Sequence, residues 1–192
     1  AAEEGADVSS ALGIVKYDPP LPASLAGRVK GAFPSFVPKT DETRVQVLEG
    51  VLARHRGKTF YVTEKLDGAS VTAYLREGEY GLCSRNQRLD EGDLDNGMCR
   101  VARELDLEAK LRAARERLGF DLALQGEIIG PGIQKNKYAL KEARLYFFNV
   151  VNLDAYRLED HARMGEILGS MGLERVPQLG TVVLDHSVDQ LV

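Results

Sequence analysis

Four stretches with strand-forming composition, spread between residues 58 and 153, constrain the fold of this chain more than any other feature. They are rich in β-branched and aromatic residues and read "KTFYVTE", "SVTAYLREGEYGLCSRNQ", "DLALQGEIIG" and "RLYFFNVVNL". The second stretch contains Glu77-Gly78-Glu79, where we expect a hairpin to turn. The chain is therefore predicted to contain antiparallel strands that form the walls of a cleft.

Helical periodicity around these strands predicts that the fold class is α+β. A first helix is expected to start near Asp41, whose side chain can serve as its N-cap. Apolar residues at helical spacing predict two further helices over residues 95–118 and 158–171, each followed by a glycine. Near the end of the chain, Ser187 and Gln190 have the spacing of a capping box, which predicts one more helix start.

Composition excludes several classes of protein. A chain of 192 residues can bury one substantial core, and its net charge of −4 argues against a uniformly basic nucleic-acid-binding surface but not against a local basic groove. No apolar run approaches the length of a membrane span, so we expect a cytoplasmic protein. Cys83 and Cys99 are interpreted as free thiols, and the three histidines, His55, His161 and His186, lack metal-ligand spacing.

The first 30 residues differ from the rest of the chain. "AAEEGADVSS" predicts a disordered acidic tail, and "YDPPLPAS" predicts a stiff, extended linker. Because a linker opens the chain and a helix start closes it, we expect these 192 residues to be a fragment of a longer protein.

The stretch "YVTEKLDGAS" places Lys65, Asp67 and Gly68 within four positions, and its five letters "EKLDG" allow two interpretations. In one, Lys65 is a solvent-facing strand lysine and the following residues form an ordinary turn. In the other, Lys65 lies in a cleft and reacts as a nucleophile once its amine is unprotonated. These residues alone favour the turn, so the other motifs must decide.

Three further motifs favour a reactive lysine. Arg85 in "CSRNQ" follows the second hairpin strand, where its guanidinium can return to the cleft and bind a phosphate or sugar. Glu127 lies in a strand that ends in "GPG", where a carboxylate can accept hydrogen bonds from a ribose hydroxyl or hold a divalent metal. In "LYFFNVV", strand alternation sends Phe147 and Phe148 to opposite faces, so one can pack in the core and the other can offer a flat face to a purine.

Together these motifs resemble the covalent nucleotidyltransferase superfamily of polynucleotide ligases and RNA capping enzymes, and within it the RNA ligases. "EKLDG" is similar to motif I, "SRN" to the arginine-bearing segment that follows, "GEIIGPGIQKN" to motif III and "YFFNV" to motif IIIa. The segment "FPSFVPKTDETRVQ" also matches, and the likeness covers roughly residues 12–192. It is greatest for the Deinococcus-type nick-sealing RNA ligases, in which an OB domain precedes the nucleotidyltransferase domain. The resemblance implies a ligase-type fold with antiparallel sheets around an ATP cleft.

The resemblance also implies a role for individual residues. Lys65 resembles the nucleophile that forms lysyl-AMP, and Glu64 resembles the position that contacts adenine. Arg85 resembles a phosphate or sugar contact and Glu127 a ribose contact, while Phe148 resembles the aromatic residue that stacks on adenine. No set of metal ligands is specified, and Glu127 is the candidate.

Other residues of these motifs have supporting roles. Gly68 is expected to let the backbone turn and a ligand approach, and Asp67 to orient the loop or a water molecule rather than to act as the base. Lys135 and Lys137 belong either to a solvated loop or to a contact with the nucleic-acid backbone. Asn149 is a departure, since many relatives have "FDI" where this chain has "FNV".

The implied chemistry has three steps. AMP passes from ATP to the lysine, then to a 5′-phosphate, and is displaced by a 3′-hydroxyl as the nucleic acid is sealed. The cofactors are ATP and a divalent ion, Mg or Mn, and the implied partner is nicked RNA or an RNA/DNA duplex, with the protein acting as a monomer away from membranes.

Two family motifs are missing from the sequence. No match to motif IV or V follows motif IIIa; "GEILG" at residues 165–169 lies in a helical pattern. Residues 1–30 are therefore interpreted as the remnant of a junction to an OB domain, and residues 31–192 as an adenylyltransferase domain without its C-terminal motifs. We expect the 192 residues alone to react poorly with labelled ATP and magnesium.

Alternatives from two classes remain open at this stage. The enzymatic alternative is a DNA ligase or a GTP-dependent RNA capping enzyme, which would differ in nucleotide preference. The non-enzymatic alternative is a nucleic-acid-binding module that keeps the fold, in which Lys65→Ala would leave every function unchanged.

Overall fold

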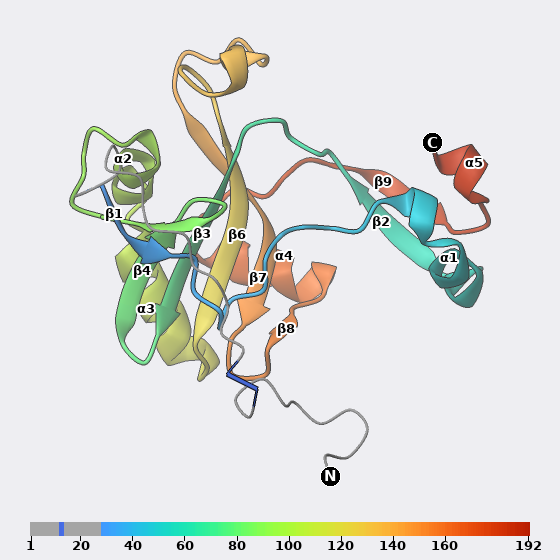
Figure 1. Cartoon of the computed structure of the whole chain (residues 1–192), viewed down its shortest axis with the longest axis horizontal. Coiled ribbons are helices and arrows are strands. Elements are labelled where there is room, and N and C mark those ends of the chain that lie inside the picture. The colour runs from blue at the N-terminus through green and yellow to red at the C-terminus, as the bar shows by residue number, and fades with distance from the viewer. Residues whose placement is uncertain (1–11, 14–27) are drawn as a thin grey trace.

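A seven-stranded sheet in the order β1-β5-β4-β3-β6-β7-β8 lies at the centre of the protein, and its neighbouring strands are antiparallel. The computed structural model describes residues 12–13 and 28–192 (Figure 1). The strands of this large sheet are β1 (Val29–Ala32), β3 (Ala69–Arg76), β4 (Glu79–Cys83), β5 (Gln87–Leu89), β6 (Leu122–Ile129), β7 (Arg144–Asn152) and β8 (Arg157–Leu158). The expected α+β architecture with antiparallel strands is confirmed.

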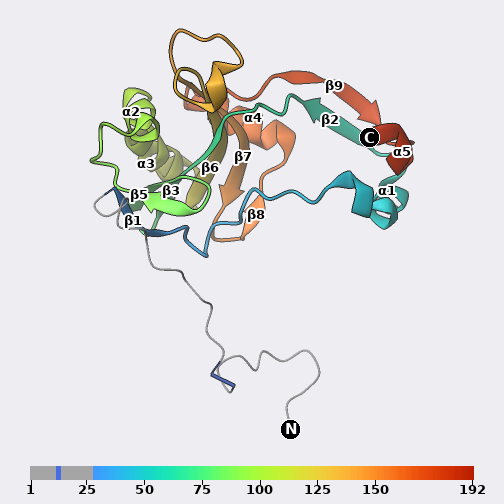
Figure 2. The same ribbon diagram turned by 45° about the horizontal axis from the view of Figure 1, so that its top comes forward.

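A small sheet of two antiparallel strands lies to one side of the large sheet (Figures 1 and 2). It pairs β2 (Thr59–Thr63) with β9 (Gln178–Val183), and the short helices α1 (Glu49–His55) and α5 (Val188–Leu191) lie beside it. Three segments of the described chain cross between the two sheets, at residues 33–44, 64–68 and 171–177. The sequence predicted β2 but not β9.

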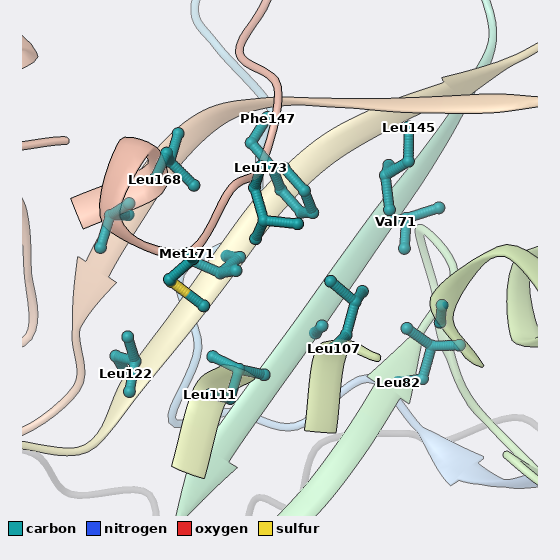
Figure 3. Packing of buried hydrophobic residues seen from close by; sticks show 14 of the residues in the cluster. Val71, Leu82, Leu107, Leu111, Leu122, Leu145, Phe147, Leu168, Met171 and Leu173 are labelled. Atoms are coloured by element: carbon teal, nitrogen blue, oxygen red, sulfur yellow. The ribbon is translucent and has the colours of Figure 1, made fainter. Parts of the chain in front are cut away.

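The hydrophobic core lies between the large sheet and the helices α2 (Gly97–Glu104), α3 (Leu107–Leu118) and α4 (His161–Ser170) (Figure 3). Leu107 and Leu111 of α3 pack over the sheet and are fully buried. Burying one such side chain contributes about 1.5–3 kcal/mol. Because strand residues alternate in direction, the strands that supply this core turn their other residues toward the opposite face.

The hairpin between β3 and β4 turns where the sequence predicted. Glu77 and Gly78 both have positive φ, 50° and 83°, as a tight two-residue hairpin requires. The N–H of Glu77 donates to Asp121 Oδ2 at 2.6 Å, and Asp121 also pairs with Arg115 of α3. The turn is therefore tied to the helix that covers the sheet.

The prediction of one helix over residues 95–118 is wrong, because α2 and α3 are separate helices. Asp106 between them has φ 52°, in the left-handed region that a continuous helix cannot contain. The apolar periodicity continues through this break because both helices cover the same core, so periodicity alone does not reveal it. The expected stop is correct, since Gly119 ends α3 with φ 77°.

The predicted starts of two other helices are also wrong. Asp41 caps no helix; a 3₁₀ turn begins at Val45 and leads into α1. The helix predicted over 158–171 begins instead at His161, because Asp160 caps it by accepting from the N–H of Arg163 at 2.9 Å. The residues before that cap form the short strand β8.

Two other predictions, the capping box and the free thiols, are confirmed by the described residues. Ser187 and Gln190 form both hydrogen bonds of a capping box at the start of α5. Cys83 and Cys99 are buried free thiols, and burial raises the pKa of Cys83 to about 12 and that of Cys99 to about 11. Within the described part of the chain, no helix has the length and apolar character needed to cross a membrane. The acidic tail and proline-rich linker lie almost wholly outside the described residues.

Candidate active site

A cavity of about 860 Å³ lies where the three crossing segments meet the large sheet. The crossing segments supply residues 40–42, residues 64–66, Gly68 and Val176 to its lining. Most of its remaining lining comes from β3, β6, β7 and the turn that follows β4, and β2, β5, α2 and the 3₁₀ turn after β6 supply one residue each. The cavity therefore combines residues far apart in sequence.

Lys65 lines this cavity directly after the end of β2. Lys65 itself is exposed, whereas its neighbour Leu66 is buried against Ile129 and Val176. The N–H of Glu64 donates to the carbonyl of Pro177 at 2.9 Å. Buried and hydrogen-bonded neighbours on both sides thus fix the backbone while the lysine side chain stays accessible.

Gly68 binds this loop to the large sheet. Its N–H donates to Glu127 Oε1 at 2.9 Å, and a Cβ at this position would lie 2.1 Å from the carbonyl oxygen of Ile128. The sequence predicted a glycine that permits a turn, but the structure shows a steric requirement, because strand β6 passes too close for any side chain.

Asp67 connects the lysine loop to the long loop between β6 and β7. Its N–H donates to the hydroxyl of Tyr138 at 2.9 Å, and its carboxylate pairs with Lys137. The hydrogen bond from Lys137 holds the pKa of Asp67 below its ordinary value. Lys137 is thus engaged with the lysine loop, while Lys135 is exposed in the 3₁₀ turn at Gln134–Asn136. The contact with Tyr138 was not expected from the sequence.

Glu127 is half-buried in the cavity wall. Burial raises the pKa of its carboxyl, although the Gly68 N–H and the nearby charge of Lys65 act in the opposite direction. Among the described residues, no three His, Cys, Asp or Glu side chains gather as a metal site. Glu127 is one of four carboxylate residues that line the cavity, with Asp41, Glu42 and Glu64. A divalent ion there would take its other oxygen ligands from a bound phosphate and from water.

Replacing Glu127 by glutamine should stabilise the protein at neutral pH but not at acid pH. Below the ordinary value of 4.5, the carboxyl is protonated in both the folded and the unfolded chain. As the pH rises from there through the raised pKa, the folded state holds more protons than the unfolded state, so stability falls. Glu127→Gln removes this loss while keeping an oxygen for the Gly68 N–H. Urea unfolding at pH 4 and pH 7 measures the difference, and an unchanged or lower stability at pH 7 would contradict it.

Phe147 and Phe148 face opposite sides of β7, as strand alternation predicted. Phe147 is fully buried in the helix-covered core, and Phe148 lines the cavity. A β-bulge opposite Gln125 and Gly126 makes Phe148 an extra residue, so Asn149 lines the cavity as well. Simple alternation along β7 would turn Asn149 toward the core, so the sequence did not predict its position in the cavity wall.

Arg85 also lines the cavity, in the turn after β4. Its guanidinium pairs at 2.5 Å with Asp41, which belongs to the first crossing segment. Both side chains are more than half exposed, so the pair contributes little stability. An anion that enters the cavity can therefore compete with Asp41 for Arg85 at low cost.

The fold thus places a lysine, an arginine, a carboxylate and an aromatic ring around one cavity, as in a nucleotide-binding site of the transferase type. The family model for RNA ligase matches residues 58–191, and the chain belongs to the RNA ligase family.

The chain is also similar to solved structures of Naegleria gruberi RNA ligase with PPi, of a mutant with ATP and Mn, and of another mutant with AMP and Mn. Each is 34% identical with a TM-score of 0.78, and each match covers 97–98% of this chain. The chain spans 55–56% of the length of these relatives. The likeness confirms the ligase-type fold. A comparison with curated proteins found no match.

Proposed function

We propose that this chain is the adenylyltransferase domain of an ATP-dependent RNA ligase, with Lys65 as the residue that carries AMP. The observation that carries the proposal is the position of Lys65 in one cavity with Arg85, Glu127 and Phe148. Membership of the RNA ligase family and likeness to a ligase solved with ATP, AMP, PPi and Mn support the same conclusion.

The proposed first step forms one bond and breaks one. The unprotonated amine of Lys65 attacks the α-phosphorus of ATP, a P–N bond forms, and pyrophosphate leaves with the electron pair of the broken P–O bond, while the nitrogen releases one proton to water. Arg85 leaves Asp41 to contact the phosphates, while bound Mg or Mn would offset their negative charge. Asp67, held by Tyr138 and Lys137, orients the loop rather than acting as the base.

The nucleoside is proposed to lie deeper in the same cavity. Phe148 stacks on the adenine ring and Glu64 contacts the base. Glu127 accepts a hydrogen bond from a ribose hydroxyl and, at the same time, the hydrogen bond from the Gly68 N–H that holds the loop in place. AMP then passes to a 5′-phosphate, and a 3′-hydroxyl displaces it to seal the strand.

The substrate is proposed to be nicked RNA or an RNA/DNA duplex, as in the Deinococcus-type ligases. The exposed Lys135, together with Lys137, supports contact with the phosphate backbone beside the cavity. The protein is proposed to act as a cytoplasmic monomer.

The proposal is tested with the complete natural protein, α-labelled ATP and magnesium. We expect label on Lys65, release of pyrophosphate, and sealing of a nicked RNA duplex. Preferred labelling by GTP would instead indicate a capping enzyme, and sealing confined to DNA nicks would indicate a DNA ligase. Absence of any covalent label would indicate a binding module.

Phe148 and Phe147 offer a matched pair of substitutions for the proposed stacking role. Phe148→Ala is expected to weaken ATP binding about tenfold with a small change in stability, because its ring faces the cavity. Phe147→Ala is expected to lower the free energy of unfolding by about 3–5 kcal/mol, because its ring is fully buried. Calorimetric titration with ATP and urea unfolding separate the two effects. Equal ATP affinity in Phe148→Ala and wild type would reject the stacking role.

A further inference from the structure

The side chain of Asn149 has a fixed direction in the cavity wall because it belongs to a chain of amide hydrogen bonds. Asn149 Nδ2 donates to Gln125 Oε1 at 2.9 Å, and Gln125 Nε2 donates to the carbonyl of Pro38 at 2.6 Å. Gln125 is only 1% exposed, so water cannot replace either partner. The three residues come from β7, β6 and the first crossing segment.

The chemistry of the partners determines which end of each amide points where. A backbone carbonyl can only accept, so Gln125 must turn its NH₂ group toward Pro38. Its oxygen then faces Asn149, which must in turn present its own NH₂ group. Of the two ends of the Asn149 amide, the NH₂ end is thus engaged by Gln125, and the carbonyl oxygen Oδ1 is the end without a protein partner among the described residues. The cavity wall beside Phe148 therefore offers a hydrogen-bond acceptor, and rotation of the amide would break the buried chain.

An acceptor beside an aromatic ring discriminates between purines. Adenine carries an amine on C6, which can donate to such an oxygen, whereas guanine carries a carbonyl there, which would be repelled. Discrimination of this kind is strong when the group on the protein is held in place by buried partners.

We propose that Asn149 is a specificity-determining residue that reads the C6 amine of the purine through its Oδ1 atom. Pro38 and Gln125 act as positioning residues that fix the direction of the amide. The inference rests on the proposed nucleotide site and adds a determinant of nucleotide choice.

The test compares ATP with purine riboside 5′-triphosphate, which lacks only the C6 amine, by calorimetric titration of the complete natural protein. We expect wild type to bind ATP about tenfold more tightly, as one neutral hydrogen bond to a fixed acceptor would give. In Asn149→Ala, and in Asn149→Leu, whose side chain branches at the same carbon, the two affinities should become equal, through weaker binding of ATP alone.

Phe148→Ala is the control, because loss of stacking should weaken both nucleotides and leave their ratio unchanged. A merely structural role of Asn149 would likewise lower both affinities together and overturn the inference. The inference is also overturned if both Asn149 variants still bind ATP more tightly than purine riboside 5′-triphosphate. If Glu64→Ala then loses this preference, Glu64 is the residue that recognises the C6 amine. Equal binding of the two nucleotides by wild type overturns this inference alone, whereas binding of neither overturns the proposed function with it.

Discussion

Lys65→Arg is expected to reduce covalent labelling by ATP roughly a thousandfold or more, because the substitution removes the proposed nucleophile. Arginine keeps the positive charge in the cavity, but a guanidinium does not lose its proton in proteins and cannot attack phosphorus. Binding of ATP should remain close to that of wild type. Denaturing gel electrophoresis of the complete natural protein after incubation with α-labelled ATP measures the loss.

Lys58→Arg is the matched control for Lys65→Arg, since Lys58 is exposed and lies outside the cavity lining. A second assay separates lysine chemistry from misfolding. If Lys65 only carries AMP, Lys65→Arg should still seal a nick whose 5′-phosphate already bears AMP, because that step needs no lysyl intermediate. Wild-type labelling of Lys65→Arg would refute the assignment of the nucleophile.

Gly68→Ala is expected to lower the free energy of unfolding by about 2–4 kcal/mol and to reduce adenylylation strongly. The added Cβ would lie 2.1 Å from the Ile128 carbonyl oxygen and 2.6 Å from Ile129 Cγ2, so strand and loop must separate. That separation would break the hydrogen bond from Gly68 to Glu127 and displace the loop that carries Lys65. Urea unfolding and the labelling assay measure the two effects.

Gly50→Ala is the control for this steric argument. A Cβ on Gly50 meets nothing within 4 Å, and the residue lies inside α1. Alanine there is expected to stabilise the protein by about 0.5–1 kcal/mol through helix propensity. If Gly68→Ala unfolded at the same urea concentration as Gly50→Ala, the close approach of β6 would have no energetic consequence and the argument would fail.

The large sheet could be predicted from the sequence because its signals are local. Strand-forming composition identified β6 and β7, and Glu77-Gly78 identified the hairpin turn. Strand β9 was missed, since it depends on pairing with β2, more than a hundred residues earlier. The break at Asp106 was missed because helices α2 and α3 share one core and one apolar period.

The candidate site was predictable to a similar extent. The motifs identified Lys65, Arg85, Glu127 and Phe148, and the fold brings all four to one cavity. Asn149 was not expected there, because a bulge is a property of two paired strands and not of either sequence alone.

Two charged residues also had unexpected partners. In the sequence, Asp41 fits the pattern of a helix cap, but in the structure it pairs with Arg85, 44 positions away. Lys137 fitted a solvated loop or a nucleic-acid contact but pairs with Asp67, 70 positions away. Such long-range ion pairs leave no signal in local sequence.

All three segments that cross between the large and small sheets line the same cavity, through Asp41, Lys65 and Val176. A ligand that fills the cavity would therefore lie against all three of these segments of the described chain. Where a change of the angle between the two sheets alters the shape of the cavity, thermodynamic reciprocity requires a bound ligand to bias that angle in turn. The cavity is therefore the place in the described structure where a ligand would couple to the relative orientation of the two sheets.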